Sequence, residues 1–262
     1  MEMAWDKHTF VICAYGDSPY LEECIQSLIH QSLQTNIILY TSTPSSNIEK
    51  LCRQYQISCY TGQGGGIGKD WNSALSFVKT DYATIAHQDD YYHKDYAKYI
   101  FESSQKYKDS LLLYSDYFEE KADKKIARTL NLKIKNLMLK TLSIFPSSPF
   151  WRKRVLAFGN AICCPAVTYH LTKLKDFRFD ETLKGNLDWV AWYKIADYKG
   201  YFTFVDKELM CHRIHEGSET SKTIEDNTRT TEDFETLCLF WPTWFAKFLM
   251  KFYIKSQKTN YQ

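Results

Sequence analysis

The sequence predicts an α/β fold with a mostly parallel sheet flanked by helices. Between residues 8 and 118, short apolar runs alternate with amphipathic stretches, which is the pattern of successive strand–helix–strand units. The composition suits a folded protein, because 44% of the 262 residues are hydrophobic and 24% are charged. We therefore expect one globular domain, or one domain with a small addition.

Five short apolar runs supply the predicted strands of the first half. Because strand–helix–strand units place successive strands in parallel, the polar residues that follow them should line a pocket at the carboxyl ends of the strands. The runs cover residues 9–14, 37–40, 57–60, 82–87 and 111–117.

A helix is predicted directly after the first strand. Ser18 and Pro19 are typical of a helix start, and Glu22 and Glu23 suit a first turn, where the helix dipole favours negative charge. Further helices are expected near residues 47–55, 69–79 and 94–107. Apolar residues of the first helix recur at the spacing of one buried face, namely Leu21, Cys24, Ile25, Leu28 and Ile29.

The second half of the chain is less regular. After Glu119 the alternation lapses through a lysine-rich stretch up to Pro149. It resumes with residues 151–159, an apolar run at 161–170 and a helical segment near 187–198. We expect this half to elaborate the sheet of the first half.

Cysteine usage and the terminal segment predict a cytoplasmic protein. The eight cysteines mostly lie inside apolar runs and lack the paired C-x-x-C spacing of a zinc site, so we expect reduced core residues. The first residues lack the basic and apolar regions of a secretory signal, and no run of about 18 apolar residues occurs that could span a bilayer.

The segment 82–92, YATIAHQDDYY, runs a predicted strand straight into His87, Gln88, Asp89 and Asp90. Two acids at the carboxyl end of a strand are placed to hold a divalent cation and a phosphorylated ligand. Taken alone, an Asp-Asp pair after an apolar run is more typical of a turn or a helix cap than of a metal site. The neighbouring motifs favour the cation.

A glycine cluster lies in residues 61–72, TGQGGGIGKDWN, between a predicted strand and a predicted helix. A dinucleotide motif needs glycine where Ile67 or Lys69 stands, and a phosphate-binding loop needs glycine at Gln63 and Ser or Thr at Asp70. The cluster therefore predicts a loop near a ligand. A nicotinamide-dependent oxidoreductase is a hypothesis that rests on this cluster only.

Residues 10–31, FVICAYGDSPYLEECIQSLIHQ, resemble the opening of family 2 glycosyltransferases. Four later elements continue the resemblance, and the first three are Asn72, the acidic motif at 87–90, and residues 177–200, which resemble F-D-E-x-L followed by an acidic-aromatic helix. Residues 210–221, MCHRIHEGSETS, look like the closing Tyr-Arg-x-His element of the family. The matching positions of the first element are Tyr15, Leu21, Cys24, Ile25, Ser27, Leu28 and Gln31.

The resemblance implies a fold similar to GT-A, a Rossmann-type sheet flanked by helices. It implies inverting transfer of a sugar from a nucleoside diphosphate sugar, expected to be a UDP-sugar, to an acceptor hydroxyl of a glycan, glycoprotein or lipid-linked saccharide. We expect a domain over residues 1–235, with a nucleotide-binding half at about 8–118 and an acceptor half at about 119–235. An aromatic and basic helix would follow at 236–262.

The resemblance also implies roles for single residues. Asp188 is expected to be the general base, because the acceptor hydroxyl must lose a proton as it attacks the anomeric carbon. Asp89, supported by Asp90 and by His215 with His212 behind it, is expected to hold Mn²⁺ or Mg²⁺ against the departing diphosphate. The three positions 89, 188 and 215 should then converge on one pocket. The expected nucleotide-sugar contacts are Ala14, Tyr15, Asp17, Thr41, Asn72, Gln88, Asp89 and Ser218.

Two further residues are expected on the acceptor side. Trp189 is suited to stacking on a sugar face, and Trp192 is expected in the core. Cys164, within Cys163-Cys164-Pro165, is expected on a strand that borders the acceptor site in the similar proteins. Structural packing is favoured over redox chemistry for this cysteine pair, because no basic neighbour would lower the pKa of either thiol.

Two departures from the family pattern concern the nucleotide. Thr41 and Ser42 stand where the similar proteins carry an acidic pair that reads the base, and His87 replaces the first acid of the Asp-x-Asp motif. They motivate an alternative hypothesis, a non-catalytic partner that keeps the fold and binds or stabilises an active transferase.

The charge pattern leaves open whether the protein contacts a membrane. Ten basic residues lie between Lys121 and Arg154 against the single acid Asp123, which fits a solvated face, an acceptor side or a membrane-facing surface. Seven aromatic residues lie between Phe240 and Tyr253, and no acid follows Glu235. This segment could lie in a bilayer interface, or pack on the domain or on a second subunit.

Overall fold

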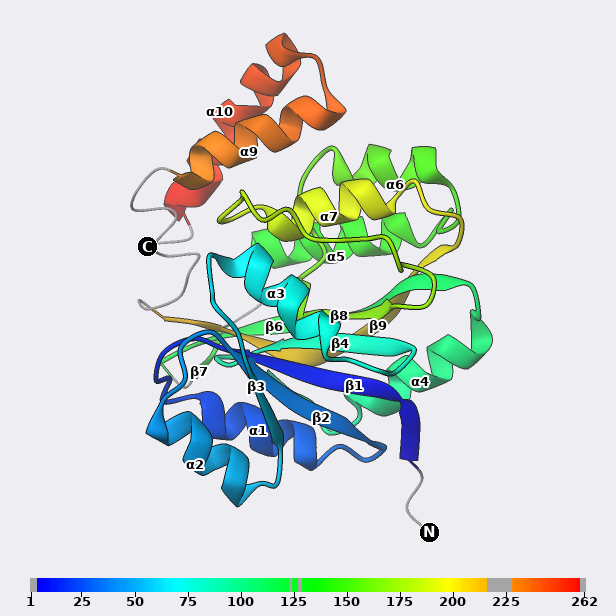
Figure 1. The fold of residues 1–262 in the computed structure, drawn as a ribbon. Coiled ribbons are helices and arrows are strands. Elements are labelled where there is room, and N and C mark those ends of the chain that lie inside the picture. Colours follow the sequence, from blue (N-terminus) through cyan, green and yellow to red (C-terminus); the bar gives the residue numbers. More distant parts are fainter. Residues whose placement is uncertain (1–3, 123, 127–128, 216–227, 260–262) are drawn as a thin grey trace.

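The computed structural model describes residues 4–122, 124–126, 129–215 and 228–259. Within these residues one nine-stranded sheet runs in the order β3-β2-β1-β4-β8-β6-β9-β5, and β7 pairs with β6. Helices cover both faces of this sheet (Figure 1). The α/β fold predicted from the alternation of apolar and amphipathic segments is confirmed.

The first four strands form the parallel half of the sheet. They are β1 (Ala4–Ala14), β2 (Gln34–Thr41), β3 (Ser58–Thr61) and β4 (Tyr82–His87). β1 lies between β2 and β4, with Val11 opposite both Ile38 and Ile85. The carboxyl ends of β1, β2 and β4 therefore lie side by side at one edge of the sheet.

The other half of the sheet is mixed. β8 (Val167–His170) runs antiparallel between β4 and β6 (Ser110–Lys121). β9 (Tyr201–Ile214) is parallel to β6, and their pairing shifts register between Ser115 and Tyr117. The short strands β5 (Tyr91–Tyr92) and β7 (Lys124–Lys125) are antiparallel to β9 and β6.

The helices of the first half follow the sequence prediction. They are α1 (Leu21–Ile29), α2 (Ser46–Gln54), α3 (Ile67–Ser76) and α4 (Tyr96–Lys106). α1 begins at Leu21, a few residues after the Ser18-Pro19 start signal. The hydroxyl of Ser45 accepts a hydrogen bond from the Ile48 amide and caps α2, which satisfies one of its free amides.

The second half adds five α-helices to the described part of the chain. The lysine-rich stretch forms α5 (Leu130–Leu142), and α6 (Pro149–Leu156) and α7 (Leu187–Ile195) follow. The C-terminal segment forms α9 (Thr228–Phe240) and α10 (Thr243–Thr259). α9 thus begins before residue 236, where the terminal helix was expected, and the chain turns at Pro242.

The apolar run at 161–170 corrects one expectation. Cys163-Cys164-Pro165 does not lie on a strand, because Cys164–Ala166 form a 3₁₀ turn and β8 begins only at Val167. Pro165 lacks the amide that a central strand would need for its hydrogen bonds.

The core lies on both faces of the sheet, because neighbouring residues of a strand point to opposite sides. Phe10 and Ile12 pack with α1, α2 and α4, whereas Val11 packs with α3, α6 and α7. Trp192 is buried in this second layer, as expected. A third, small cluster joins Trp189 of α7 to α9 and α10, so the C-terminal helix pair is docked on the domain. None of the described helices combines the length and the hydropathy needed to cross a membrane.

Candidate active site

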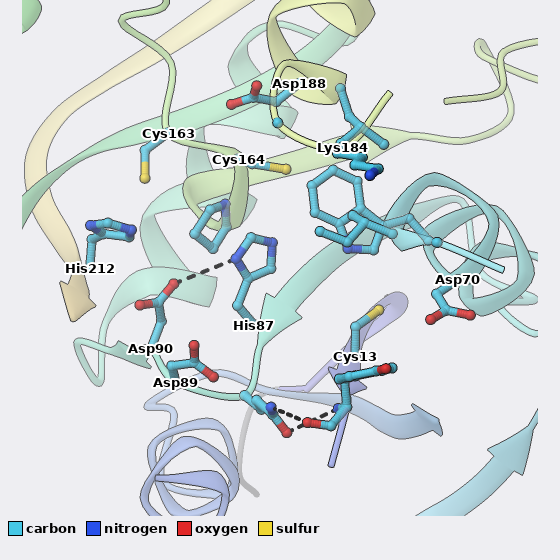
Figure 2. A pocket seen from close by; sticks show the side chains of 18 of the residues that line it. Cys13, Asp70, His87, Asp89, Asp90, Cys163, Cys164, Lys184, Asp188 and His212 are labelled. Carbon is cyan, nitrogen blue, oxygen red and sulfur yellow. Dashed lines mark hydrogen bonds and ion pairs between the residues drawn. The ribbon is translucent and has the colours of Figure 1, made fainter. Parts of the chain in front are cut away.

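A cavity of about 850 Å³ lies at the carboxyl ends of β1, β2 and β4. We call one side of it the strand-end wall, which comprises Ala14, Tyr15, Ser42, Asp70, Gln88 and Asp89. The opposite side, the helix wall, comprises Asn160, Cys163, Cys164, Asp188 and Arg229. Figure 2 shows Asp89 and Asp188 on the two sides of this space.

The side chain of Gln88 joins the ends of β1 and β4. Its amide nitrogen donates to the carbonyl of Tyr15 over 2.8 Å, and its amide oxygen accepts from the Tyr15 amide over 3.1 Å. The Tyr15 ring itself is exposed at the mouth of the cavity. Gln88 therefore fixes the main chain at the rim and leaves the Tyr15 ring available to a flat ligand group.

A carboxylate from α3 occupies the end of β2. The hydroxyls of Ser42 and Tyr40 donate to Asp70 over 2.8 and 3.2 Å, and Asp70 lines the cavity. The sequence interpretation missed this residue, because it looked for an acid directly after the second strand. The adjacent DWN segment at the start of a helix was the available signal.

The glycine cluster forms part of the same wall. Gly64, Gly65 and Gly66 line the cavity with positive φ angles of 71°, 119° and 115°. Side chains at these positions would be strained, so glycine lets the main chain pass close to a ligand. A loop near a ligand was the predicted role of this segment.

Arg213 ties the acidic motif to β9. Its guanidinium donates to the Asp89 carbonyl over 3.0 Å and to Glu23 over 2.7 Å, and its amide donates to Asp90 over 2.9 Å. Only 4% of the Arg213 side chain is exposed. These bonds hold the main chain of the motif in place while the Asp89 carboxylate stays free to face the cavity.

The side chains around Asp89 fit a hard divalent cation. Asp89 Oδ2 lies 2.9 Å from His215 Nε2. Asp90 Oδ2, His87 Nε2 and His212 Nδ1 are buried without a hydrogen-bond partner among the described residues. Buried polar atoms without partners are uncommon and suggest an additional ligand, and carboxylate oxygen with imidazole nitrogen suits Mn²⁺ or Mg²⁺. In the described part of the chain no three such side chains already form a ligand cluster.

Burial sets the protonation of these groups. It lowers the pKa of His87 and of His212 to about 4, so both imidazoles are neutral and can donate a lone pair. Burial also raises the pKa of Asp90, although its bond from the Arg213 amide opposes this. His87 and His212 thus offer lone pairs of neutral nitrogens near the acidic motif.

Asp188 lies in the first turn of α7 and faces the cavity from the helix wall. Asn160 Nδ2 donates to its Oδ2 over 2.6 Å, and the Trp189 amide donates to its Oδ1 over 2.7 Å. Burial raises the pKa of Asp188, while Arg229 and the bond from Asn160 act in the opposite direction. A carboxylate with a raised pKa, held in one orientation, is suited to accept a proton.

The turn before Asp188 is held by α9. The Glu232 carboxylate accepts hydrogen bonds from the amides of Lys184, Gly185 and Asn186 over 2.7, 2.7 and 2.8 Å. The Asn186 side chain donates to Asp233 over 2.7 Å. No local sequence pattern indicates this arrangement, since the partners lie 46–48 residues apart.

The structure brings most of the expected site residues to the cavity. Asp89 and Asp188 line it together, and His215, which is not among the lining residues, contacts Asp89. Ser218 lies outside the described residues. The other expected residues that line the cavity are Ala14, Tyr15, Gln88, Asp90 and Cys164.

Four expected contacts are placed elsewhere, which corrects those expectations. The Asn72 amide donates to the Phe179 carbonyl and accepts from the Phe179 amide, so it holds the loop before α7. Thr41 is buried and accepts from the Thr43 amide. Asp17 accepts from the Ser45 hydroxyl, away from the cavity.

The fourth is Trp189, which was expected to stack on an acceptor sugar. Its side chain is 1% exposed, its indole nitrogen donates to the Leu156 carbonyl over 2.9 Å, and its ring stacks on Phe240. In the first turn of α7, Asp188 points to the cavity and the next residue turns into the protein, because successive helical residues are about 100° apart. Trp189 therefore anchors the helix.

The cysteines of the helix wall are structural. Cys164 is buried with its sulfur 3.6 Å from the Tyr169 hydroxyl, and burial raises the pKa of both the Cys163 and Cys164 thiols. A protonated thiol is a poor nucleophile, which agrees with the packing role expected for this pair.

Comparisons with known proteins bear on the family and the fold of the chain. The model of glycosyl transferase family 2 matches residues 9–209. S. aureus TarS 1–349 in complex with UDP-GlcNAc is similar in structure, with a TM-score of 0.60, 16% identity, and coverage of 93% of this chain and 70% of that chain. No curated protein matches the sequence.

A second similar structure is the mannosyltransferase PcManGT from Pyrobaculum calidifontis in complex with GDP-Man and Mn²⁺. Its TM-score is 0.67 at 11% identity, with coverage of 93% of this chain and 69% of that chain. At such identities the likeness concerns the fold.

Proposed function

The chain belongs to glycosyl transferase family 2, and we propose that it transfers a sugar, with inversion, from a nucleoside diphosphate sugar to an acceptor hydroxyl. The observation that carries the proposal is that Asp89 and Asp188 face one cavity from its two walls. One acid lies where a diphosphate would bind, and the other lies where a proton must be removed.

The strand-end wall is proposed to bind the donor. The exposed Tyr15 ring and the Asp70 carboxylate, held by Ser42, offer a stacking surface and a hydrogen-bond acceptor for a nucleobase. A carboxylate pairs with a ring N–H, which both uracil and guanine carry. UDP-sugars are the proposed donors, since the similar TarS structure holds UDP-GlcNAc.

A divalent cation is proposed to be held by Asp89, Asp90 and His215. Asp90 Oδ2 has no hydrogen-bond partner among the described residues and lies 3.8 Å from His87 Nδ1. This oxygen and the close approach of Asp89 to His215 support this set. When bound, Mn²⁺ or Mg²⁺ would offset the negative charge that grows on the departing diphosphate. Arg213 acts through the main chain of the motif and keeps both carboxylates in position.

Asp188 is proposed to be the general base. Asn160 and the Trp189 amide orient its carboxylate, so one oxygen can take the proton of an acceptor hydroxyl as that oxygen attacks the anomeric carbon. The bond from the anomeric carbon to the diphosphate breaks on the opposite side, which inverts the configuration. Glu232 positions Asp188 by holding the preceding turn.

The acceptor is proposed to be a glycan, a glycoprotein or a lipid-linked saccharide that enters beside the helix wall. The protein is proposed to act in the cytoplasm. Residues 236–262 contain four lysines and no acid, and they are proposed to bring it to the inner face of a membrane.

A thermal-shift screen with nucleoside diphosphate sugars, with and without Mn²⁺, tests the donor proposal. A donor at about 100 times its Kd stabilises the native state by about 2.7 kcal/mol. We expect the largest shift with a UDP-sugar and Mn²⁺, followed by release of UDP when acceptor is added. If no nucleoside diphosphate sugar stabilises the protein with or without the cation, the proposal is wrong.

A further inference from the structure

An aromatic surface extends beyond the cavity, across α6 and the corner between α9 and α10. Four large residues on it are about half exposed or more: Phe150 is 67% exposed, Phe158 56%, Trp244 72% and Phe248 49%. So many exposed rings in one area are unusual for a soluble surface and mark a contact site. We call these four residues, with the rings and cations between them, the aromatic platform.

Ring contacts make the platform continuous. Phe158 packs edge-on against Trp241 at 5.4 Å between centroids, and Trp241 contacts Phe245 at 4.8 Å. Phe245 lies 5.4 Å from Trp244 and 5.9 Å from Phe248. Phe158, Trp244 and Phe248 are therefore connected through Trp241 and Phe245.

The cation of Arg154 completes the connection to α6. Its guanidinium lies 5.3 Å from the Phe150 ring and 5.1 Å from the Trp241 ring, so it connects α6 to the turn between α9 and α10. The indole nitrogen of Trp241 donates to the Ala157 carbonyl over 2.8 Å. These contacts join the turn between α9 and α10 to α6, and the helix pair also packs on Trp189 of α7.

The charge of the platform is positive. Arg154, Lys247 and Lys251 are exposed on its helices, and no acid occurs in residues 236–262. Trp and Phe beside Lys and Arg suit the interface of a bilayer, where rings enter the headgroup region and cations meet lipid phosphates. Charge complementarity selects an anionic bilayer over a neutral one.

The platform adjoins the helix wall of the cavity. Phe158 lies two residues before Asn160, which donates to Asp188, and Trp189 next to Asp188 donates to the Leu156 carbonyl. An acceptor embedded in a bilayer beneath the platform would therefore present its headgroup close to the general base.

We propose that the aromatic platform docks the enzyme on an anionic lipid bilayer and that its acceptor is a lipid-linked saccharide presented there. This inference rests on the proposed function and extends it: the membrane contact includes α6 and the turn after it, not the C-terminal residues alone. The headgroup then reaches Asp188 without leaving the membrane surface.

Vesicle pelleting with the full chain tests the proposal. The probes are phosphatidylcholine vesicles with and without about one third phosphatidylglycerol. We compare the wild type with Phe150→Ser/Phe158→Ser, with Trp244→Ser/Phe248→Ser, and with Tyr107→Ser, an exposed aromatic residue after α4. Circular dichroism and melting temperature check that each variant is folded.

We expect the wild type and Tyr107→Ser to pellet with anionic vesicles only, and each double variant to bind at least about tenfold more weakly. If only Trp244→Ser/Phe248→Ser lost vesicle binding, the platform proposal would be overturned, and the membrane contact would be confined to the C-terminal residues. Equal pelleting of all variants, or of both vesicle types, would also overturn it. Donor-induced thermal shifts of the same variants should match the wild type, so a failed platform is distinguished from a failed donor proposal.

Discussion

The two walls of the cavity differ in how their polar and charged side chains are held. On the strand-end wall, Arg213 pairs with Glu23 and holds the acidic motif, and the side chains of Gln88 and Ser42 each bond a neighbour within the wall. On the helix wall, a carboxylate with a raised pKa faces the cavity, held by Asn160. The strand-end wall thus offers side chains held by hydrogen bonds for a diphosphate, whereas the helix wall offers a carboxylate that can accept a proton.

Replacement of the base should give the largest effect and should affect turnover only. Asp188→Asn keeps the shape of the side chain but cannot accept a proton, so kcat should fall about 10²–10⁴-fold. The donor Kd, measured by calorimetry, should change less than about twofold, because the donor lies on the other wall. Asp197→Asn, which alters an exposed acid just beyond α7, serves as the control. Retained turnover in Asp188→Asn would contradict the assignment.

Loss of the positioning residue should come next. Glu232→Ala removes the acceptor of three amide hydrogen bonds, each worth about 1.5–3 kcal/mol to a charged group, and so should lower both the melting temperature and kcat. Glu232→Gln, which keeps an acceptor oxygen, should recover part of kcat while KM for the donor stays constant. If kcat falls only in proportion to the folded fraction, Glu232 is merely structural.

A change on the strand-end wall should alter donor recognition rather than turnover. Asp70→Asn removes the charge of the proposed base acceptor, and we expect the Kd of the preferred nucleotide to rise about tenfold, or about 1.4 kcal/mol. kcat at saturating donor should stay close to that of the wild type. Glu49→Gln on α2 is a matched control outside the cavity. An unchanged ranking of nucleotides by affinity would remove Asp70 from the base site.

The smallest effect concerns pH. The base must be ionised, so kcat/KM falls as the pH drops below the pKa of Asp188, and the raised pKa places this fall above the usual range of an Asp. Asn160→Ala removes a hydrogen bond that lowers this pKa, so the acidic limb of the profile should move to higher pH. Asn136→Ala, which removes a bond to Asp116 elsewhere, should leave the limb in place. A shift to lower pH in Asn160→Ala would contradict the account.

The sequence predicted the strand-end wall better than the helix wall, for a physical reason. A strand can be recognised from a local apolar run in the sequence. Gln88 and Asp89 directly follow such a run, β4, so the topology of a parallel sheet places them at its carboxyl edge. The helix wall combines Asn160, Asp188 and Arg229 from three separate segments, and only motif position identified Asp188. Periodicity carries no information on such contacts.

The sequence also did not predict which way some side chains point from their helices. Asn72 and Trp189 occupy positions that the family pattern assigns to the site, yet their side chains bond Phe179 and Leu156. The α7 sequence is apolar on most sides, so its pattern did not indicate that Asp188 would face the cavity and Trp189 the C-terminal helices. Asp70 was overlooked because an acid was expected directly after the second strand. Asp70 instead lies on α3, which brings its carboxylate to the end of β2.

The central claim is that one cavity binds the donor on the strand-end wall and activates the acceptor on the helix wall. Anomalous diffraction from crystals of Asp188→Asn grown with a UDP-sugar and Mn²⁺ tests it most directly. The account predicts an Mn²⁺ peak in contact with Asp89 and His215, with the anomeric carbon between that ion and residue 188. A peak remote from Asp89, or a sugar directed away from residue 188, would contradict it.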